Sequence, residues 1–474
     1  MGVKDSLLSA AMRRYRCELC RTDRGGDPAT FSAWGMTMFG NSAPVREDLR
    51  RRLTSQLKQT LFSDSPVARA LTIATICGAL ASGLFFTVSA LFFTRVVGLQ
   101  AATVALGLTI AGALGVLCTP LSGYAADRVN PHLLIVLGTA GQGLAYLAYV
   151  AASGTTSFIV TACCVVACRS IQSTARLALV AQTFVGPERV SLRARFRSLD
   201  NVFIGIGTLV AGFALLSDTP AAYRVTMIFP GIFFLLACLP LIVLARRLPP
   251  TARNENAGGA DTPTSGLPSG SVLRDKTYLA VTALNAVMAM QFGMQAVGVP
   301  LWITTRTHAP PVVISVLLIM NTVLIALLQV RASRRSDDIA FAGRLVLRAG
   351  ILLAASCVLY ALSGHVVAVV ATALLLVAGL AQTGAEMFSE AGSWGLAFEL
   401  ADPSRAGAYQ GASQTGFALG TMLGPYVVTA TAVEHGTMGW AAVGGLFLAA
   451  GVATCLVARS AAARQRLVGV AETG

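Results

Sequence analysis

The sequence predicts an all-α integral membrane protein with about twelve transmembrane helices in two six-helix bundles. Of its 474 residues, 55% are hydrophobic and only 12% are charged, a balance that water-soluble proteins of this length do not show. Apolar runs long enough to cross about 30 Å of hydrocarbon recur along most of the chain. A stretch rich in Pro, Gly, Ser and Asn at 248–271 has the composition of a flexible linker and separates these runs into two sets.

The alternation of polar and apolar stretches predicts five parts. The two long apolar parts are the bundles, and the polar parts before, between and after them are expected in the cytoplasm. In chain order the parts are a tail (1–65), the first bundle (66–247), a linker (248–275), the second bundle (276–459) and a tail (460–474).

The first tail contains one stretch with helical character. Leucines between residues 46 and 62 share one helical face beside several arginines, a pattern typical of a helix that lies on a membrane surface. Two alternatives stay open for residues 1–40. These residues form a disordered leader, or they precede the true start of the protein at Met36 or Met38.

The 36 Lys and Arg residues set the orientation, because cytoplasmic loops carry an excess of them. With a cytoplasmic N-terminus, only Arg95, Arg224 and Arg306 lie outside, while Arg169 and Arg176 lie within a span. Both termini are therefore predicted to be cytoplasmic, and we expect a multi-pass protein of the cell membrane. The net charge of +14 follows from this topology, so we expect no nucleic-acid partner.

The chain carries no motif for catalysis or for a resident metal. Most of its ten cysteines lie in apolar runs and behave there as small hydrophobic residues. Cys17 and Cys20 stand alone, whereas a closed zinc site needs four ligands. No Gly-x-x-x-x-Gly-Lys-Ser/Thr loop for nucleotide phosphates is present. We expect no cofactor, no metal and no enzyme activity.

A charged turn interrupts the apolar sequence between the second and third expected spans. Gly123 allows close helix contact, Asp127 can face the positive N-terminal end of another helix, and Arg128 stays at the aqueous edge. The spacing Gly123-x-x-x-Asp127-Arg128 resembles the loop signature of the major facilitator superfamily of secondary transporters. Asn130-Pro131-His132 stand where that family usually has Gly, Arg and Lys. The resemblance implies a gating role for the three residues; the alternative is an ordinary charged turn.

An arginine stands inside the fourth expected span, where a charge is costly unless it faces water, a ligand or a partner. The run Arg169-x-x-Gln172-Ser173 resembles the family's fourth-helix pattern Arg-x-x-Gln-Gly, and that resemblance implies a part for Arg169 in proton coupling. Gln172 is its companion candidate. The alternative is that Arg169 is a structural counter-ion for a neighbouring helix.

Two carboxylates, Glu386 and Glu390, stand four residues apart on one face of the tenth expected span. A carboxyl buried beside another binds a proton more readily than one in water. We hypothesise that Glu386 and Arg169 form the coupling machinery, with Glu390 as the next candidate. In the alternative, the helix ends near Ala385 and both acids are wet.

Polar side chains in the seventh and eighth expected spans are further candidates for the cavity lining. Each of them is open to a second interpretation as a hydrogen bond between helices. They are Asn285, Gln291, Gln295 and Asn321.

Small residues form one face of the eleventh expected span. Glycines at every fourth position, Gly416, Gly420 and Gly424, favour close and sliding helix contact, and Pro425 adds a kink. Together with Arg405 at the start of the span, they are candidates for a gate or for the contact between the two bundles. The run from 403 to 425 resembles the eleventh helix of efflux carriers of the superfamily.

The resemblance implies a secondary transporter that works by alternating access. We expect proton-coupled efflux of a small drug-like or antibiotic compound by a monomer in lipid. Import of a nutrient or metabolite is the alternative, because the first expected span lacks the acid that many drug–proton exchangers place there. A membrane sensor or assembly partner that transports nothing is the hypothesis of a different class.

Overall fold

The computed structural model describes residues 65–217, 219–247 and 272–473. These residues form α-helices joined by short turns, with no strand among them. All but the last residue of the expected tail at 1–65, including its surface helix, and most of the expected linker lie outside the described residues.

Among the described residues, six α-helices precede the 248–271 gap, and they pack on one another. We call them the N-terminal half. Their bounds are α4 (Pro66–Leu91, continued by a π-helical turn, Phe92–Val96), α5 (Ala101–Arg128), α6 (Pro131–Val150), α7 (Thr155–Thr183), α8 (Pro187–Ser217) and α9 (Pro220–Arg247).

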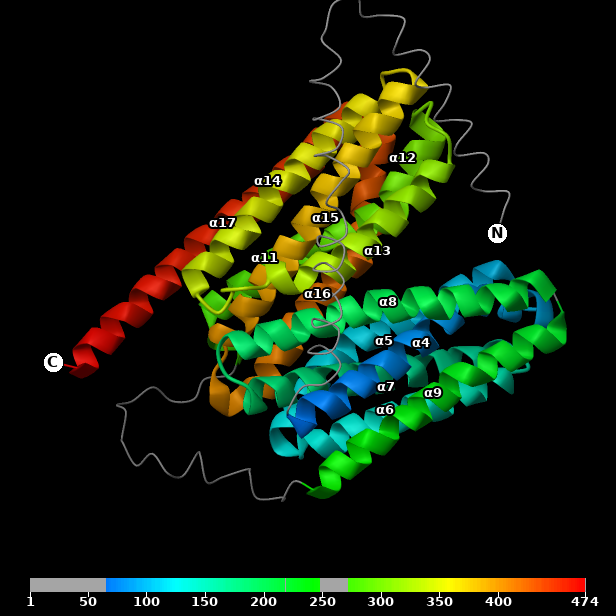
Figure 1. Ribbon diagram of the computed structural model, residues 1–474, viewed down its shortest axis with the longest axis horizontal. Helices are drawn as coiled ribbons and strands as arrows, with labels where there is room; N and C mark the ends of the chain where they lie inside the picture. The colour runs from blue at the N-terminus through cyan, green and yellow to red at the C-terminus, as the bar shows by residue number, and fades with distance from the viewer. Residues whose placement is uncertain (1–64, 218, 248–271, 474) are drawn as a thin grey trace, which may run out of the picture. The chain divides into compact units, whose positions relative to one another are not determined.

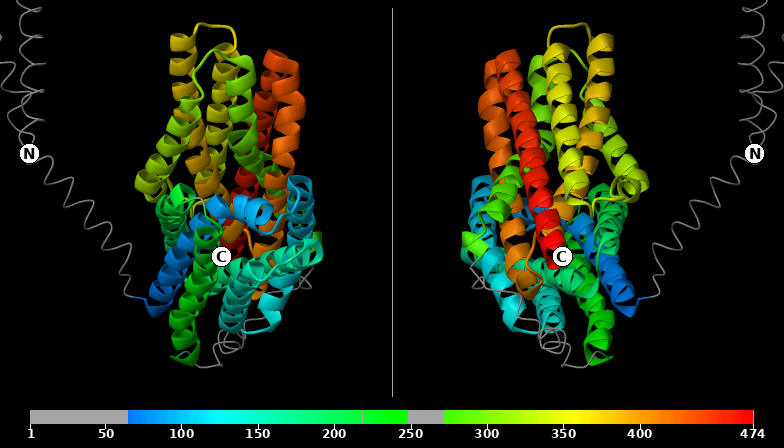
Figure 2. Two further views of the ribbon diagram at one scale, coloured as in Figure 1. Left: turned by 90° about the vertical axis from the view of Figure 1, so that its right-hand side faces the viewer. Right: turned by 90° about the vertical axis from the view of Figure 1, so that its left-hand side faces the viewer.

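The helices after the gap form the C-terminal half. Figures 1 and 2 show them, coloured light green to red, gathered beside the blue-to-green helices of the N-terminal half. Their bounds are α11 (Lys276–Gly293), α12 (Val299–Arg306), α13 (Val312–Ala332), α14 (Ile339–Ser363), α15 (Ala368–Glu399), α16 (Ala406–Val428) and α17 (Glu434–Thr473). Short 3-10 or π-helical turns lie at Val272–Arg274, Met294–Gly298, Pro403–Arg405 and Thr429–Val433.

Local sequence explains where several helices begin. An Asn or Asp side chain just before the helix accepts a hydrogen bond from a first-turn backbone N–H, which otherwise has no partner. Asn130 caps α6 in this way, Asp275 caps α11 and Asp338 caps α14. Gly436 sits near the start of α17 at φ +62°, a left-handed conformation that glycine adopts without steric cost.

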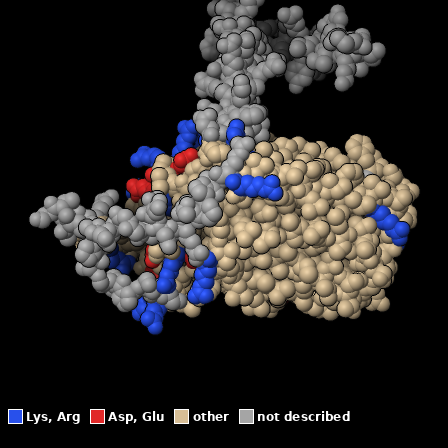
Figure 3. Space-filling view, turned by 90° about the horizontal axis from the view of Figure 1, so that it is seen from below, with Lys and Arg blue, Asp and Glu red and all other residues tan. Residues whose placement is uncertain are grey.

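The outer surface is apolar. Leu117, Leu121, Leu209 and Phe213 are 65–74% exposed, and Figure 3 shows the charged side chains gathered mainly at one end of the face in view. Ten stretches of the described residues are long and apolar enough to span a membrane. The protein is therefore a multi-pass membrane protein.

Those ten stretches do not map one to one onto the helices. α8 is not among them, and the last, 63 residues long, contains both α16 and much of α17.

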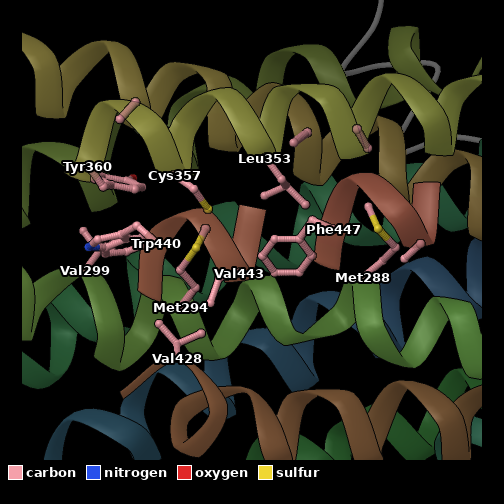
Figure 4. Packing of buried hydrophobic residues seen from close by; sticks show 14 of the residues in the cluster. Met288, Met294, Val299, Leu353, Cys357, Tyr360, Val428, Trp440, Val443 and Phe447 are labelled. Carbon is pink, nitrogen blue, oxygen red and sulfur yellow. The ribbon is translucent and has the colours of Figure 1, made fainter. Parts of the chain in front are cut away.

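The largest apolar cluster belongs to the C-terminal half. Tyr360, Trp440 and Phe447 are fully buried in it, and Figure 4 shows them on the facing sides of neighbouring helices. The Trp302 indole N–H donates to the Tyr360 carbonyl at 2.8 Å. All the helices of this half contribute to the cluster, and α13, α15 and α16 also contact the other half.

Candidate functional site

The most extensive contacts between the two halves are made by four helix pairs: α5 with α16, α7 with α16, α8 with α13, and α8 with α15. α8 is central because its side chains reach α13, α15 and α16 of the opposite half. The Ser198 hydroxyl of α8 donates to the backbone carbonyls of Ile325 and Ala326 in α13, at 3.2 and 2.9 Å. The side chains around α8 therefore decide how the halves hold together.

Arg197 of α8 pairs with both carboxylates of α15. Its Nη2 lies 2.6 Å from Glu386 Oε1, and its Nε lies 3.3 Å from Glu390 Oε2. The Glu386 and Glu390 side chains are only 2% and 7% exposed. The alternative in which α15 ends near Ala385 and both acids are wet is wrong, because α15 continues to Glu399.

The two carboxylates differ in the hydrogen bonds that their oxygens accept. Glu386 accepts from Arg197 through Oε1 and from the Asn321 side-chain amide of α13 through Oε2, at 2.8 Å. Glu390 Oε2 is buried and faces Arg197 Nε at 3.3 Å, but it accepts no hydrogen bond. A buried oxygen without a hydrogen bond is unfavourable, so Glu390 is the less firmly held carboxylate and the better candidate for binding a proton or a ligand.

Arg193 stands one turn before Arg197 on α8. Its Nη2 donates to Gln414 Oε1 of α16 at 3.1 Å, and its guanidinium lies 5.0 Å from the ring centre of Trp394 on α15. Its Nη1 is buried and has no hydrogen-bond partner. Arg193 and Glu390 attract each other electrostatically, but neither Arg193 Nη1 nor Glu390 Oε2 makes a hydrogen bond.

A cavity of about 340 Å³ of empty space, part of it open to solvent, lies where these residues meet. We call it the polar cavity. Arg193 comes from the N-terminal half, and the other lining residues come from α11, α15 and α16. The polar lining includes Asn285, Gln291, Ser413, Gln414 and Glu390, and the aromatic lining is Phe292, Trp394 and Phe417.

A second cavity of about 340 Å³ lies within the C-terminal half. Gln295, Asn321 and Gln382 contribute amides to its lining. The Tyr360 hydroxyl donates to Gln382 Oε1 at 2.6 Å. Thus all four amide candidates, Asn285, Gln291, Gln295 and Asn321, line one cavity or the other.

Arg169 and Gln172 lie apart from these cavities. Arg169 was expected to act with Glu386, but the cation that pairs with Glu386 is Arg197. Arg169 is exposed on α7. Arg169 lies within electrostatic range of Asp200 in α8. Gln172 packs its backbone and Cβ against Gly138 of α6.

The charged turn reaches across to the opposite half. Asp127, near the end of α5, accepts hydrogen bonds from the backbone N–H groups of Gly407 and Ala408, at 2.6 and 2.7 Å. These are the first N–H groups of α16, where the helix dipole favours a negative charge. Arg405 adds an electrostatic attraction to Asp127, and exposed Arg128 lies 4.0 Å over the Tyr124 ring. We call the contact of Asp127 with Gly407 and Ala408 the latch.

Glycines bring α5 and α16 together beside the latch. A Cβ at Gly123 would lie 2.4 Å from the Gly407 carbonyl oxygen, and a Cβ at Gly407 would lie 2.5 Å from the Gly123 carbonyl oxygen. The two backbones therefore touch with no room for a side chain.

A second set of glycines on α16 packs against α11. Cβ atoms at Gly416, Gly420 and Gly424 would clash with Thr282, Ala286 and Met290 of α11. The close-packed face expected from the glycine spacing is present. The expectation that it joins the two bundles is wrong, because α11 and α16 belong to the same half. Pro425 lies against Gly293 of α11.

Sequence reasoning missed Arg193, Arg197 and Asp200. Hydropathy alone places the start of the fifth span at Leu199, where the continuous apolar run begins, but α8 begins at Pro187. A signal was present in their spacing, because positions 193, 197 and 200 share one helical face. No group of three or more His, Cys, Asp or Glu side chains suited to a metal occurs within the described ranges.

Comparison with known proteins agrees with this architecture. Residues 71–425 match the sequence profile of the Major Facilitator Superfamily. The chain belongs to this superfamily. No curated protein sequence matches the chain.

Solved structures share the superfamily fold. The human organic anion transporter MFSD10 matches with a TM-score of 0.60 at 15% identity, covering 83% of this chain and all of that one. A bacterial homologue of the iron transporter ferroportin, in an outward-facing state, matches with a TM-score of 0.63 at 15% identity, covering 83% of this chain and 98% of that one. At this identity the likeness concerns the fold.

Proposed function

We propose that this superfamily member is a proton-coupled secondary transporter that exports a small drug-like or antibiotic compound by alternating access. The observation that carries the proposal is the ion pairing of the partly buried Arg197 with the buried Glu386 and Glu390 at the contact between the halves. Charges inside a membrane bundle are costly and usually mark a transport path or a proton relay. A carboxylate that changes partner when it binds a proton provides a means of coupling.

The latch supports the alternating-access part of the proposal. Hydrogen bonds from α16 to Asp127 and the glycine contact beside them join the halves at one end. They involve no bulky interlocking side chain, so the contact can break and re-form as one half rocks against the other. Arg128 and Arg405, at the same end, are proposed to assist this gate.

The proposed topology has twelve spans with both termini in the cytoplasm. It counts α8 as a span, counts α16 and α17 separately, and takes α11 and α12 as one span. The gathering of charged side chains at one end in Figure 3 supports this sidedness through the positive-inside rule. We propose that the transporter works as a monomer in the cell membrane.

Export is proposed from the resemblance of the eleventh helix to efflux carriers. Import of a nutrient or metabolite uses the same fold and is the alternative direction. A non-transporting sensor would not need buried charges beside a cavity between the halves, so the site disfavours that class.

The test is expression of the full chain in an efflux-deficient bacterium exposed to a panel of toxic compounds, with an Arg197→Gln variant of equal membrane abundance as the control. Export predicts higher tolerance to at least one compound, lost in the variant. Greater sensitivity to a compound would indicate import. Unchanged tolerance, together with no uptake or release of any panel compound by purified protein in liposomes, would overturn the transport function.

A further inference from the structure

We propose that the polar cavity binds a zwitterionic aromatic substrate, whose anionic group pairs with Arg193 and whose ammonium group pairs with Glu390. This inference rests on the proposed transport function and adds a substrate class to it. It starts from three buried polar atoms that have no hydrogen-bond partner and belong to residues lining one cavity: Arg193 Nη1, Glu390 Oε2 and Gln291 Oε1.

These three atoms are complementary to a zwitterion. Arg193 Nη1 is a donor on a permanent cation, which suits a carboxylate. Glu390 Oε2 and Gln291 Oε1 are acceptors, which suit an ammonium group with its three N–H donors. A substrate with only one charged group forms one of these two interactions and leaves a polar atom on the other side without a hydrogen bond, which is unfavourable.

The walls of the polar cavity suit an aromatic body. Phe292, Trp394 and Phe417 line it together with the polar groups. Phe292 and Phe417 lie edge to face with their ring centres 5.4 Å apart, and the Trp394 ring lies beside the Arg193 guanidinium. A flat ring can pack against such walls.

The charges around Glu390 link this substrate to proton coupling. Arg197, Arg193 and Asp200 face Glu390 from α8, and Glu386 faces it from its own helix. The cavity lining from α11 and α16 is uncharged. A proton on Glu390 removes the negative charge that attracts the ammonium group, so proton and substrate compete for one site. Such competition is what exchange of a substrate for a proton requires.

The experiment uses four probes with one ring body: phenylalanine, phenylalaninamide, N-acetylphenylalanine and N-acetylphenylalaninamide. In that order, they carry both an ammonium and a carboxylate, only the ammonium, only the carboxylate, and no charge. Their affinities for the purified full chain in detergent are measured from ligand-dependent thermal stabilisation. We expect phenylalanine to bind at least about tenfold more tightly than each blocked probe, since charge-assisted hydrogen bonds are the strong ones.

Variants assign each charge to its partner. Arg193→Gln should weaken phenylalanine about tenfold but leave phenylalaninamide unchanged, because the amide offers no carboxylate. Glu390→Gln should weaken phenylalanine and leave N-acetylphenylalanine unchanged. The matched controls are Arg189→Gln and Glu399→Gln, which break the other described α8–α15 ion pair, 3.7 Å long and outside the cavity lining. They should alter none of the four affinities.

The probes still decide the question if a variant fails to fold. Equal affinity for phenylalanine and either singly charged probe overturns the proposal, as does a lack of stabilisation by all four at millimolar concentration. If export from cells persists while zwitterions show no preference, the substrate class is wrong and the transport function stands. If the probe preference holds while no compound is transported, the site stands and the transport function falls.

Discussion

Arg197 of α8 and Glu386 of α15 approach each other to 2.6 Å across the contact between the two halves. Asn321 of α13 holds the second oxygen of Glu386 at 2.8 Å. Three helices from both halves thus meet at one carboxylate. Any movement of one half against the other must preserve or break this ion pair.

We expect Arg197→Gln to lower stability markedly. It leaves two nearly unexposed carboxylates, Glu386 and Glu390, without their cation, and breaking a buried ion pair costs about 3–5 kcal/mol. Thermal unfolding in detergent measures the loss. The double variant Arg197→Gln with Glu386→Gln should recover part of it, because one unpaired charge is removed.

Arg189→Gln is the control for the Arg197 prediction. The Arg189–Glu399 pair also joins α8 to α15, but it is longer and its side chains are 18% and 22% exposed. Neither of its charges is as deeply buried as Glu386 or Glu390, so its contribution should lie nearer the about 0–1 kcal/mol of solvent-exposed pairs. A loss in Arg189→Gln as large as that in Arg197→Gln would contradict this ranking.

Glu390→Gln should uncouple transport from protons. The sequence ranked Glu386 first, but both Glu386 oxygens accept hydrogen bonds, whereas Glu390 Oε2 has the longer 3.3 Å ion pair with Arg197 and accepts no hydrogen bond. A glutamine resembles a permanently protonated glutamate, so substrate exchange should persist while the response to an imposed pH gradient disappears. Both are measured in proteoliposomes with a compound from the toxicity panel.

Glu386→Gln separates the two carboxylates. It should weaken the hold on Arg197 while some response to the pH gradient remains. If Glu390→Gln still concentrates substrate as the gradient steepens and Glu386→Gln does not, the roles are reversed. If both variants still respond, the proton site lies elsewhere.

Asp127→Asn should slow transport and leave substrate affinity nearly unchanged. The asparagine keeps an acceptor oxygen for α16 but loses the charge that the helix N-terminus favours, a change of about 0.3–1 kcal/mol. The latch lies apart from the residues that line both cavities, so binding should not depend on it. Turnover and affinity are measured separately in liposomes.

Asp338→Asn is the matched control for the latch. Asp338 accepts a hydrogen bond from the Phe341 N–H at 2.8 Å, so it also caps a helix, but within the C-terminal half. Its substitution should affect turnover little. A large loss of substrate affinity in Asp127→Asn with intact turnover would exclude the gating role.

The latch shows how much the sequence could predict. A carboxylate after a glycine at a membrane rim indicated a contact with a helix N-terminus, and the structure identifies that helix as α16. The sequence could not choose the partner helix, since many N-termini offer the same free N–H groups. The same limit applied to Gly420, whose spacing indicated a close contact but not that α11 makes it.

The charged end of α8 shows why the site was only partly predictable. Hydropathy penalises each charge by its cost in lipid, so it places the start of the fifth span at Leu199, which leaves Arg197 outside the span and Asp200 at its edge. In the protein these residues face other helices and carry partners. Ion pairs between distant segments form only in the folded protein. They offset the cost that each charge would have on an isolated helix in lipid.

Gly420→Ala should destabilise the C-terminal half and reduce transport. The added Cβ would lie 2.0 Å from the Ala286 carbonyl oxygen and 2.9 Å from the Ala289 Cβ. Because both neighbours belong to α11, the helices must separate, at a cost of about 1–3 kcal/mol for an overpacked contact. Gly112→Ala is the control, since a Cβ there meets nothing within 4 Å and alanine favours a helix more than glycine does. Thermal unfolding and transport by equal amounts of inserted protein compare the two variants. Gly420→Ala protein as stable and active as Gly112→Ala would show that α11 and α16 do not pack this closely in the membrane.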